Sequence, residues 1–204
     1  YTGGCTKWNN QVISAQTNQI YEIKAAVRYM RSIAGEYNLD PDRIALLGES
    51  AGGHLCNMVG TTNGETEYDL AELGNIEYSS DVQAVIGQYS FGTLKTENDS
   101  TLTRLCGVDT AEMDKEARKA LLNQISPVSH VDESDPPFYL EHGLSDKTVS
   151  YTQSVDFYNA LVAAGNTRSE LHLYPGMDHG VAWFQTEQNA EGFLTWLDGI
   201  FGVD

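Results

Sequence analysis

The segment Ile44-Ala45-Leu46-Leu47-Gly48-Glu49-Ser50-Ala51-Gly52-Gly53-His54 sets the architecture that we expect of this chain. Its first four residues form a short, continuous apolar run, which is typical of a parallel strand buried on both faces. Residues 51–61 then have the composition of a helix. A G-x-S-x-G pattern centred on Ser50 separates the two. The segment therefore predicts a buried strand, a sharp turn and a helix that begins beside an exposed serine.

The same alternation of strands and helices continues through the chain. We expect strands near residues 43–48, 82–87, 137–141 and 170–174. Longer helices are expected at about 20–37, 51–61, 151–164 and 186–201, and shorter ones near 101–106 and 111–124. The first helix is amphipathic, since apolar residues at helical spacing alternate with basic ones. The apolar positions are Ile20, Ile23, Val27 and Met30, and the basic ones are Lys24, Arg28 and Arg31.

Strands that alternate with helices predict a mainly parallel sheet that is covered on both faces. We therefore expect residues 1–204 to form a single α/β domain, a three-layer α/β/α sandwich, with a small cap-like insertion at about residues 90–130. Ligands of such sheets bind beyond the carboxyl ends of the strands. Functional residues should gather at that edge.

Ser50 is the predicted nucleophile. The turn would expose its hydroxyl at the positive end of the following helix, and the backbone N–H of Ala51 would donate a hydrogen bond to a developing oxyanion. A serine hydroxyl is a poor nucleophile without a neighbouring base. The pattern therefore requires a histidine elsewhere in the chain.

His179 is the predicted base among the five histidines of the chain. It follows an expected strand and lies in a loop with flanking glycines, which would let the loop fold over the edge of the sheet. We expect structural roles for the other four. His54 should pack beneath the turn, His130 should lie in a loop, His142 should be half-buried at the end of a strand, and His172 should lie inside a strand.

Asp146 is the predicted acid that orients the base. It follows the strand that ends near Glu141, so it should reach the same edge of the sheet as Ser50 and His179. Asp178 is the rival acid, but its position next to His179 makes direct support of the imidazole awkward. The chain order Ser, Asp, His is the one used by α/β-hydrolases.

Several blocks of sequence carry a wider resemblance. They are Ile20 to Tyr29, Asp40 to Ile44, Gly48 to His54, Ser126 to Val131, Asp135 to Phe138, His142-Gly143 with Asp146 and Val149, and Gly176 with His179-Gly180. Over roughly residues 18–202 the chain resembles α/β-hydrolases of the esterase/lipase group. That group includes hormone-sensitive-lipase-like carboxylesterases and feruloyl or acetyl-xylan esterases. The resemblance implies an α/β-hydrolase fold, the triad Ser50, Asp146 and His179, and no metal or organic cofactor.

The front of the chain departs from this group. A His-Gly-Gly-Gly-type loop normally precedes the serine turn and supplies further oxyanion amides. Here only Gly3 and Gly4 could be the tail of such a loop. The strands that should precede residues 43–48 are also missing. We therefore expect the chain to be incomplete at its N-terminus, and the edge of the 43–48 strand to be covered by chain beyond this sequence or by another copy.

The net charge of −17, from 29 acidic and 12 basic residues, argues against nucleic acid and anionic membranes as partners. The sequence has no apolar run long enough to span a bilayer and no leader-like start. The three cysteines lack metal-ligand spacing, and their odd number favours a reducing, cytoplasmic compartment, with a secreted protein left open.

We expect a serine esterase that forms an acyl-enzyme on Ser50. Its substrate would be a small-molecule or carbohydrate-linked ester, either with a short acyl chain or an acetyl or feruloyl ester of plant polysaccharide. A homo-oligomer stays open. Two other functions stay open as well: a peptidase-like amide hydrolase on the same fold, and a catalytically silent hydrolase-like module that binds ligands or partners.

Overall fold

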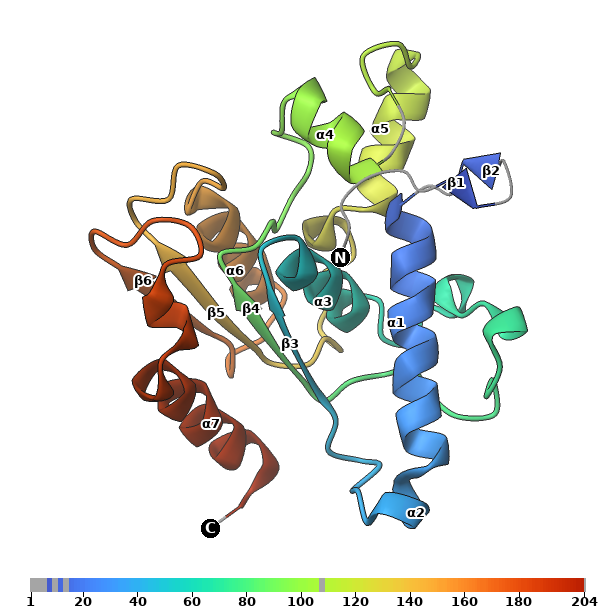
Figure 1. The fold of residues 1–204 in the computed structure, drawn as a ribbon, viewed down its shortest axis with the longest axis vertical. Coiled ribbons are helices and arrows are strands. Elements are labelled where there is room, and N and C mark those ends of the chain that lie inside the picture. The colour runs from blue at the N-terminus through green and yellow to red at the C-terminus, as the bar shows by residue number, and fades with distance from the viewer. Residues whose placement is uncertain (1–6, 9–10, 13–14, 107–108, 204) are drawn as a thin grey trace.

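The computed structural model describes residues 7–8, 11–12, 15–106 and 109–203. Its centre is a parallel sheet of four strands in the order β3-β4-β5-β6 (Figure 1). These strands are β3 (Ala45–Glu49), β4 (Ala84–Gln88), β5 (Phe138–Gly143) and β6 (Glu170–Tyr174). All four lie where the sequence predicted strands.

Helices cover both faces of the sheet (Figure 1). On one face lie α1 (Ala15–Ser32), α3 (Ala51–Thr61) and α6 (Thr152–Ala163). On the other face lies α7 (Glu187–Phe201). Strand β4 shows the alternation that this requires, because Val85 packs toward α3 and α6 whereas Ala84 and Ile86 pack toward Trp196 of α7. The expected α/β/α sandwich is confirmed.

Three shorter helices complete the set. The short α2 (Ala34–Tyr37) ends at Asn38, which has a left-handed backbone with a φ of 55°. Helices α4 (Asp99–Cys106) and α5 (Lys115–Gln124) stand beyond the carboxyl ends of the strands (Figure 1). Helix α5 starts four residues later than the sequence predicted, because the Asp114 side chain accepts hydrogen bonds from the N–H groups of Glu116 and Ala117 and so caps the helix there.

The α4–α5 region has its own apolar cluster, which reaches the sheet edge at two points. Leu94, Leu102, Leu122 and others pack together, and the cluster includes Val149 and contacts Ala51. Ala51 begins α3 directly after Ser50, and Val149 lies three residues after Asp146. The segment that we expect to act as a cap is therefore packed against the two turns that carry the predicted nucleophile and acid.

Strand β3 differs from its prediction as a strand buried on both faces. It is the edge strand of the described sheet, and Leu47 is 49% exposed. A groove of about 360 Å³ lies between β3 and α1, lined by apolar side chains that include Ile23, Met30 and Leu46. Within the described residues, β1 (Lys7–Trp8) and β2 (Gln11–Val12) pair only with each other. That other chain covers this edge stays a prediction.

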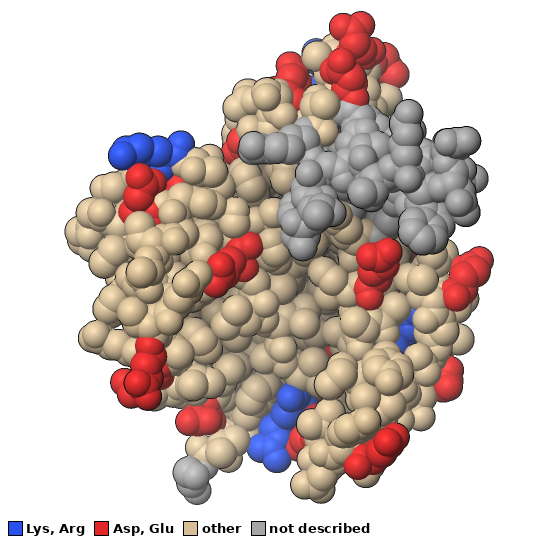
Figure 2. All heavy atoms as spheres, in the orientation of Figure 1, with Lys and Arg blue, Asp and Glu red and all other residues tan. Residues whose placement is uncertain are grey.

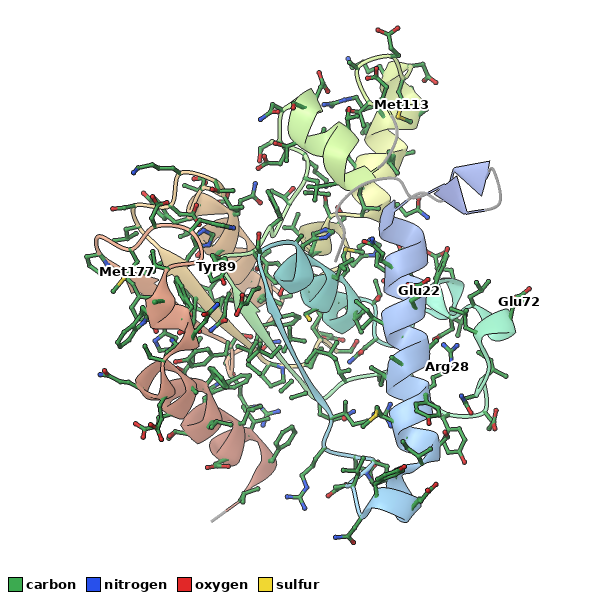
Figure 3. All side chains as sticks on the ribbon, viewed as in Figure 1. Glu22, Arg28, Glu72, Tyr89, Met113 and Met177 are labelled. Carbon is green, nitrogen blue, oxygen red and sulfur yellow. The ribbon has the colours of Figure 1, made fainter. Side chains whose placement is uncertain are left out.

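Helix α1 buries two of its basic residues and exposes one of its apolar ones. Met30 is 43% exposed, whereas the basic residues Lys24 and Arg28 are completely buried. The Lys24 Nζ donates a hydrogen bond to the Thr62 carbonyl at 2.6 Å, and burial lowers the pKa of this amine. Arg28 points from α1 into the 62–83 loop, which holds Glu72 (Figure 3). The buried cations thus fasten this loop to the helix.

Arg28 makes the fullest set of these contacts. Its guanidinium donates to the Asp69 carboxylate at 2.6 Å and to the carbonyls of Leu70 and Gly74, each at 3.1 Å. Replacing it with Met would leave these acceptors without a donor in a buried position. We expect Arg28→Met to lower the free energy of unfolding by about 3–5 kcal/mol in urea titrations.

Arg43→Met is the matched control, because the Arg43–Asp40 ion pair is formed by side chains that are 46% and 41% exposed. It should cost less than about 1 kcal/mol. Equal losses in the two variants would contradict the anchoring role of Arg28.

Asp135 gives the fold a pH dependence. Burial raises the pKa of this carboxyl from 3.8 to about 7, and its Oδ2 accepts a hydrogen bond from the Asp132 N–H. The folded state therefore holds this proton more tightly than the unfolded state. The resulting stabilisation is complete below the pKa that Asp135 has in the unfolded chain. It is lost as the pH rises through the pKa that Asp135 has in the folded protein.

Asp135→Asn should remove this loss, because an amide keeps an accepting oxygen and cannot ionise. We expect the melting temperature of the variant to exceed that of the wild type by about 3 °C or more at pH 8. The difference should shrink toward pH 4. A constant difference between pH 4 and pH 8 would show that Asp135 does not titrate as described.

Candidate active site

The turn after β3 holds Ser50 in a strained backbone conformation. Its φ is 52° and its ψ is −118°, a region that non-glycine residues rarely occupy. Two hydrogen bonds fix this conformation: the Ser50 N–H donates to the Gln88 carbonyl at 2.9 Å, and the Ser50 carbonyl accepts from the His54 N–H at 3.0 Å. The strand–turn–helix arrangement that the sequence predicted is present.

Two glycines make the turn sterically possible. A Cβ at Gly48 would collide with the Gly52 carbonyl, and a Cβ at Gly53 would lie 2.6 Å from the Ser90 Cβ and 2.8 Å from the Gly48 oxygen. Real side chains do not fit at such distances. The chain can therefore fold back over β3 and β4 only because these positions lack side chains.

The structure brings the three predicted triad residues together. The Ser50 Oγ lies 2.8 Å from the His179 Nε2, and the His179 Nδ1 lies 2.7 Å from the Asp146 Oδ2. Ser50 comes from the β3–α3 turn, Asp146 from the turn after β5, and His179 from the loop after β6. The Asp146 side chain is completely buried and that of His179 is 19% exposed. This arrangement can carry a proton from the serine to an imidazole that a buried carboxylate orients.

Asp146 is held in place by its own turn. Its Oδ1 accepts the N–H groups of Thr148 and Val149 at 2.8 Å and 2.9 Å. The other carboxylate oxygen, Oδ2, is then directed at the imidazole. The contact with the His179 Nδ1 comes from Asp146 and not from Asp178, as the sequence predicted.

Asp178 ties the two loops together instead. Its Oδ1 accepts the N–H of Lys147 at 3.0 Å and the N–H of His179 at 2.8 Å, and these two hydrogen bonds lower the pKa of the Asp178 carboxyl. Its Oδ2 also lies 3.3 Å from the Lys147 Nζ. Asp178 therefore clips the acid-bearing turn to the base-bearing loop.

The other histidines lie largely as expected, with one correction. His54 is fully buried beneath the turn, where its Nε2 contacts the Ile125 carbonyl at 2.8 Å and burial lowers its pKa to about 4. His130 and His172 pair with Glu65 and Glu170. The prediction that His142 is half-buried is wrong: its side chain is completely buried, because the turn after β5 folds back over the end of the strand.

Tyr89 is a neighbour of the base that the sequence analysis missed. It follows β4, has a φ of 38°, and its ring packs against the His179 ring with centroids 4.8 Å apart. Burial raises the pKa of its hydroxyl, and the nearby Glu49 carboxylate raises it further. Figure 3 shows Tyr89 and Met177 near each other on the side of the molecule where the strands end. No local sequence pattern marks a tyrosine with this backbone conformation.

A buried carboxylate beneath the site was also missed. Glu141 is fully buried and accepts hydrogen bonds from the Gln88 Nε2 at 2.7 Å, from the Tyr174 hydroxyl at 2.6 Å and from the Asn189 Nδ2. Tyr174 is the last residue of β6 before the His179 loop, and the Gln88 carbonyl holds Ser50. An acidic residue directly after the apolar run Phe138–Leu140, and still within the strand, was the signal that could have pointed to this network.

The oxyanion site is described only in part. Ala51 is the first residue of α3, so its N–H belongs to the helix N-terminus and has no intrahelical acceptor. It can donate to an oxyanion formed beside Ser50. The tentative donors Gly3 and Gly4 lie outside the described residues.

The described residues offer neither a metal-binding cluster nor a membrane-spanning helix. No group of three or more His, Cys, Asp or Glu side chains in residues 15–106 and 109–203 lies close enough together to hold a metal ion. No helix in this part of the chain is both long and apolar enough to cross a bilayer.

The chain is similar to several known ester hydrolases. The model of the BD-FAE family matches residues 9–161. Esterase LipC of Mycobacterium tuberculosis is 31% identical over 79% of this chain and 40% of its own length. A truncated carbohydrate esterase from gut microbiota is 30% identical, with a TM-score of 0.73 over 88% of this chain and 68% of its own. An acetyl ester-xyloside bifunctional hydrolase from Caldicellulosiruptor lactoaceticus is 26% identical, with a TM-score of 0.72 over 90% and 65% of the two chains. The chain spans less than half the length of three curated mycobacterial esterases that it matches.

The clip formed by Asp178 can be tested with two substitutions. Asp178→Ala removes the oxygen that accepts the N–H groups of Lys147 and His179, so the loops that carry Asp146 and His179 should loosen. We expect kcat for a p-nitrophenyl ester to fall about 10- to 100-fold, because small misplacements of a catalytic group are costly.

Asp178→Asn is the matched variant, since its amide oxygen can still accept both hydrogen bonds. It should keep kcat within about threefold of the wild-type value, because hydrogen bonds with neutral acceptors still align the loops. If Ala and Asn lower kcat equally, the carboxylate charge matters and the clip does not.

Proposed function

The chain belongs to the BD-FAE family of α/β-hydrolase esterases, and on this basis we propose that it hydrolyses carboxylic esters through an acyl-enzyme on Ser50. One observation carries the proposal: the unbroken relay from the Ser50 Oγ through both nitrogens of His179 to the buried Asp146 carboxylate, with contacts of 2.8 Å and 2.7 Å. A nucleophile, a base and an orienting acid are thus in hydrogen-bond reach of one another.

The acylation step follows from this geometry. The Nε2 of His179 takes the Ser50 proton while the Oγ attacks the ester carbonyl, and the carbonyl electron pair moves onto the oxygen. The Ala51 N–H and the positive end of α3 stabilise this oxyanion. When the tetrahedral intermediate collapses, the bond to the alcohol breaks. The imidazolium gives its proton to the leaving alcohol, and Ser50 keeps the acyl group.

Deacylation repeats the cycle with water. The neutral His179 removes a proton from a water molecule that attacks the acyl carbonyl. Collapse of the second intermediate breaks the bond to the Ser50 Oγ, which recovers its proton from the imidazolium and releases the acid. The Asp146 carboxylate keeps its charge throughout and stabilises the imidazolium in both steps.

We further propose a neutral, carbohydrate-linked ester with a short acyl group as the substrate. Two of the similar proteins are named as a carbohydrate esterase and as an acetyl ester-xyloside hydrolase. The net charge of −17 disfavours anionic substrates, and Figure 2 shows acidic side chains spread over the visible face with few basic ones. The α4–α5 region, which packs against Ala51 and Val149, would border the acyl pocket.

A substrate panel with one active-site variant tests the proposal. Wild-type protein should release p-nitrophenol from acetyl and butyryl esters faster than from long-chain esters, and it should release acetate from acetylated xylan. Ser50→Ala should lower kcat by at least about 10⁴-fold, because the attacking group is lost.

Ser150→Ala is the control, since this exposed hydroxyl contacts only Thr152 in the turn beyond Asp146. It should leave turnover unchanged. Equal ester hydrolysis by wild type and Ser50→Ala would contradict the proposal. Cleavage of anilides faster than esters would favour a peptidase, and a wild-type protein without turnover that still binds xylan would favour a silent binding module.

A further inference from the structure

A second histidine lies against the acid of the triad. His142 is the last residue but one of β5 and lies four residues before Asp146, and both side chains are completely buried. The His142 Nε2 lies 3.2 Å from the Asp146 Oδ2, the same oxygen that contacts the His179 Nδ1 at 2.7 Å. Two imidazoles therefore converge on one carboxylate oxygen.

The contacts of His142 indicate which of its two ring nitrogens carries the hydrogen. Its Nε2 faces two atoms that can only accept, the Asp146 Oδ2 at 3.2 Å and the Val149 carbonyl oxygen at 3.0 Å. Its Nδ1 lies 2.8 Å from the Ser154 Oγ, a hydroxyl that can donate. The Nε2 thus carries the hydrogen, and Ser154 donates to the bare Nδ1. Burial lowers the pKa of this imidazole.

The position of Asp146 does not depend on this contact. The backbone N–H groups of Thr148 and Val149 already hold its Oδ1. What His142 adds is the partial positive charge of its Nε2–H, which donates to the Val149 carbonyl and lies beside the Asp146 Oδ2, with the Nε2 3.2 Å from that oxygen. A positive charge beside the carboxylate makes it less attractive to the His179 imidazolium.

We propose that His142 is a positioning residue that acts through Asp146: its Nε2–H places a partial positive charge beside Oδ2 and so lowers the basicity of His179. This rests on the proposed function, in which His179 must be neutral to accept the Ser50 proton.

The ionisable groups around this pair are few. His142 is faced by Asp146 from its own turn and by His179 from the loop after β6, whereas α6 presents only the Ser154 hydroxyl. His179 is faced in addition by Tyr89 from the end of β4. Asp178 and Lys147 pair at the rim. Glu49 and Glu141 act on Tyr89 rather than on His142.

Two amide substitutions separate the effect of this N–H from the loss of a histidine. In His142→Gln the side-chain amide reaches the place of Nε2 and keeps an N–H beside Oδ2. In His142→Asn the shorter amide reaches only the place of Nδ1, beside Ser154. The pKa of His179 is measured in the substrate-free protein from its Cε1–H proton resonance, assigned with His179→Asn. This measurement reports even if no ester is ever hydrolysed, so it is independent of the proposed function.

We expect His142→Asn to raise the pKa of His179 by about 0.5–1 unit, because Oδ2 loses the neighbouring N–H, and we expect His142→Gln to keep the wild-type value. If esters are hydrolysed, the acidic limb of kcat/KM should move to higher pH by the same amount while the plateau stays within about threefold. No shift, or a shift to lower pKa, in folded His142→Asn would overturn the proposal.

His54→Asn is the matched control, because His54 is equally buried and contacts the Ile125 carbonyl rather than the acid. It should leave the His179 titration unchanged, and an equal rise there would also overturn the proposal. If His142→Asn does not fold, nitrogen NMR of the wild-type protein decides. His142 must then stay neutral with its proton on Nε2 while His179 titrates, and a proton on Nδ1 would contradict the proposal.

Discussion

The backbone strain at Ser50 is the constraint on which the rest of the site depends. A φ of 52° at a residue with a side chain is tolerated only where the surroundings enforce it. Here the Gln88 carbonyl holds the Ser50 N–H, and the bare glycines at 48 and 53 let the turn press against β4. The strain lifts the hydroxyl out of the sheet at the start of α3. Without it, Ser50 would be an ordinary residue at a helix N-terminus.

The rest of the site is built from the carboxyl ends of β5 and β6. The turn after β5 presents one oxygen of the buried Asp146 side chain, and the loop after β6 presents His179 between that oxygen and Ser50. The first loop is held by its own backbone amides, and Asp178 fastens the two loops together. Beneath them, Glu141 joins Gln88, Tyr174 and Asn189. The precision of the relay thus comes from side chains outside the triad.

The sequence predicted those features that depend on local patterns. The strands, the serine turn and the residues Ser50, Asp146 and His179 all follow from apolar runs, glycine positions and loops after strands. The sequence analysis failed where the burial of a side chain depends on segments that lie far away in the sequence. Arg28 and Lys24 look like a solvent-facing stripe until the 62–83 loop folds over them, and Leu47 looks buried until β3 proves to be an edge. His142 and Tyr89 were undervalued for the same reason, because their neighbours come from other strands.

The central claim is that Ser50 is an activated nucleophile. Its most direct test is the mass of the protein after brief exposure to a fluorophosphonate ester, followed by mapping of the modified peptide. A serine activated by the His179–Asp146 relay should gain one phosphonyl group at Ser50 with loss of fluoride, and Asp146→Asn should slow this reaction at least about 100-fold because the base loses its orienting acid. A protein that stays unmodified, or one that is labelled at another residue, would contradict the account.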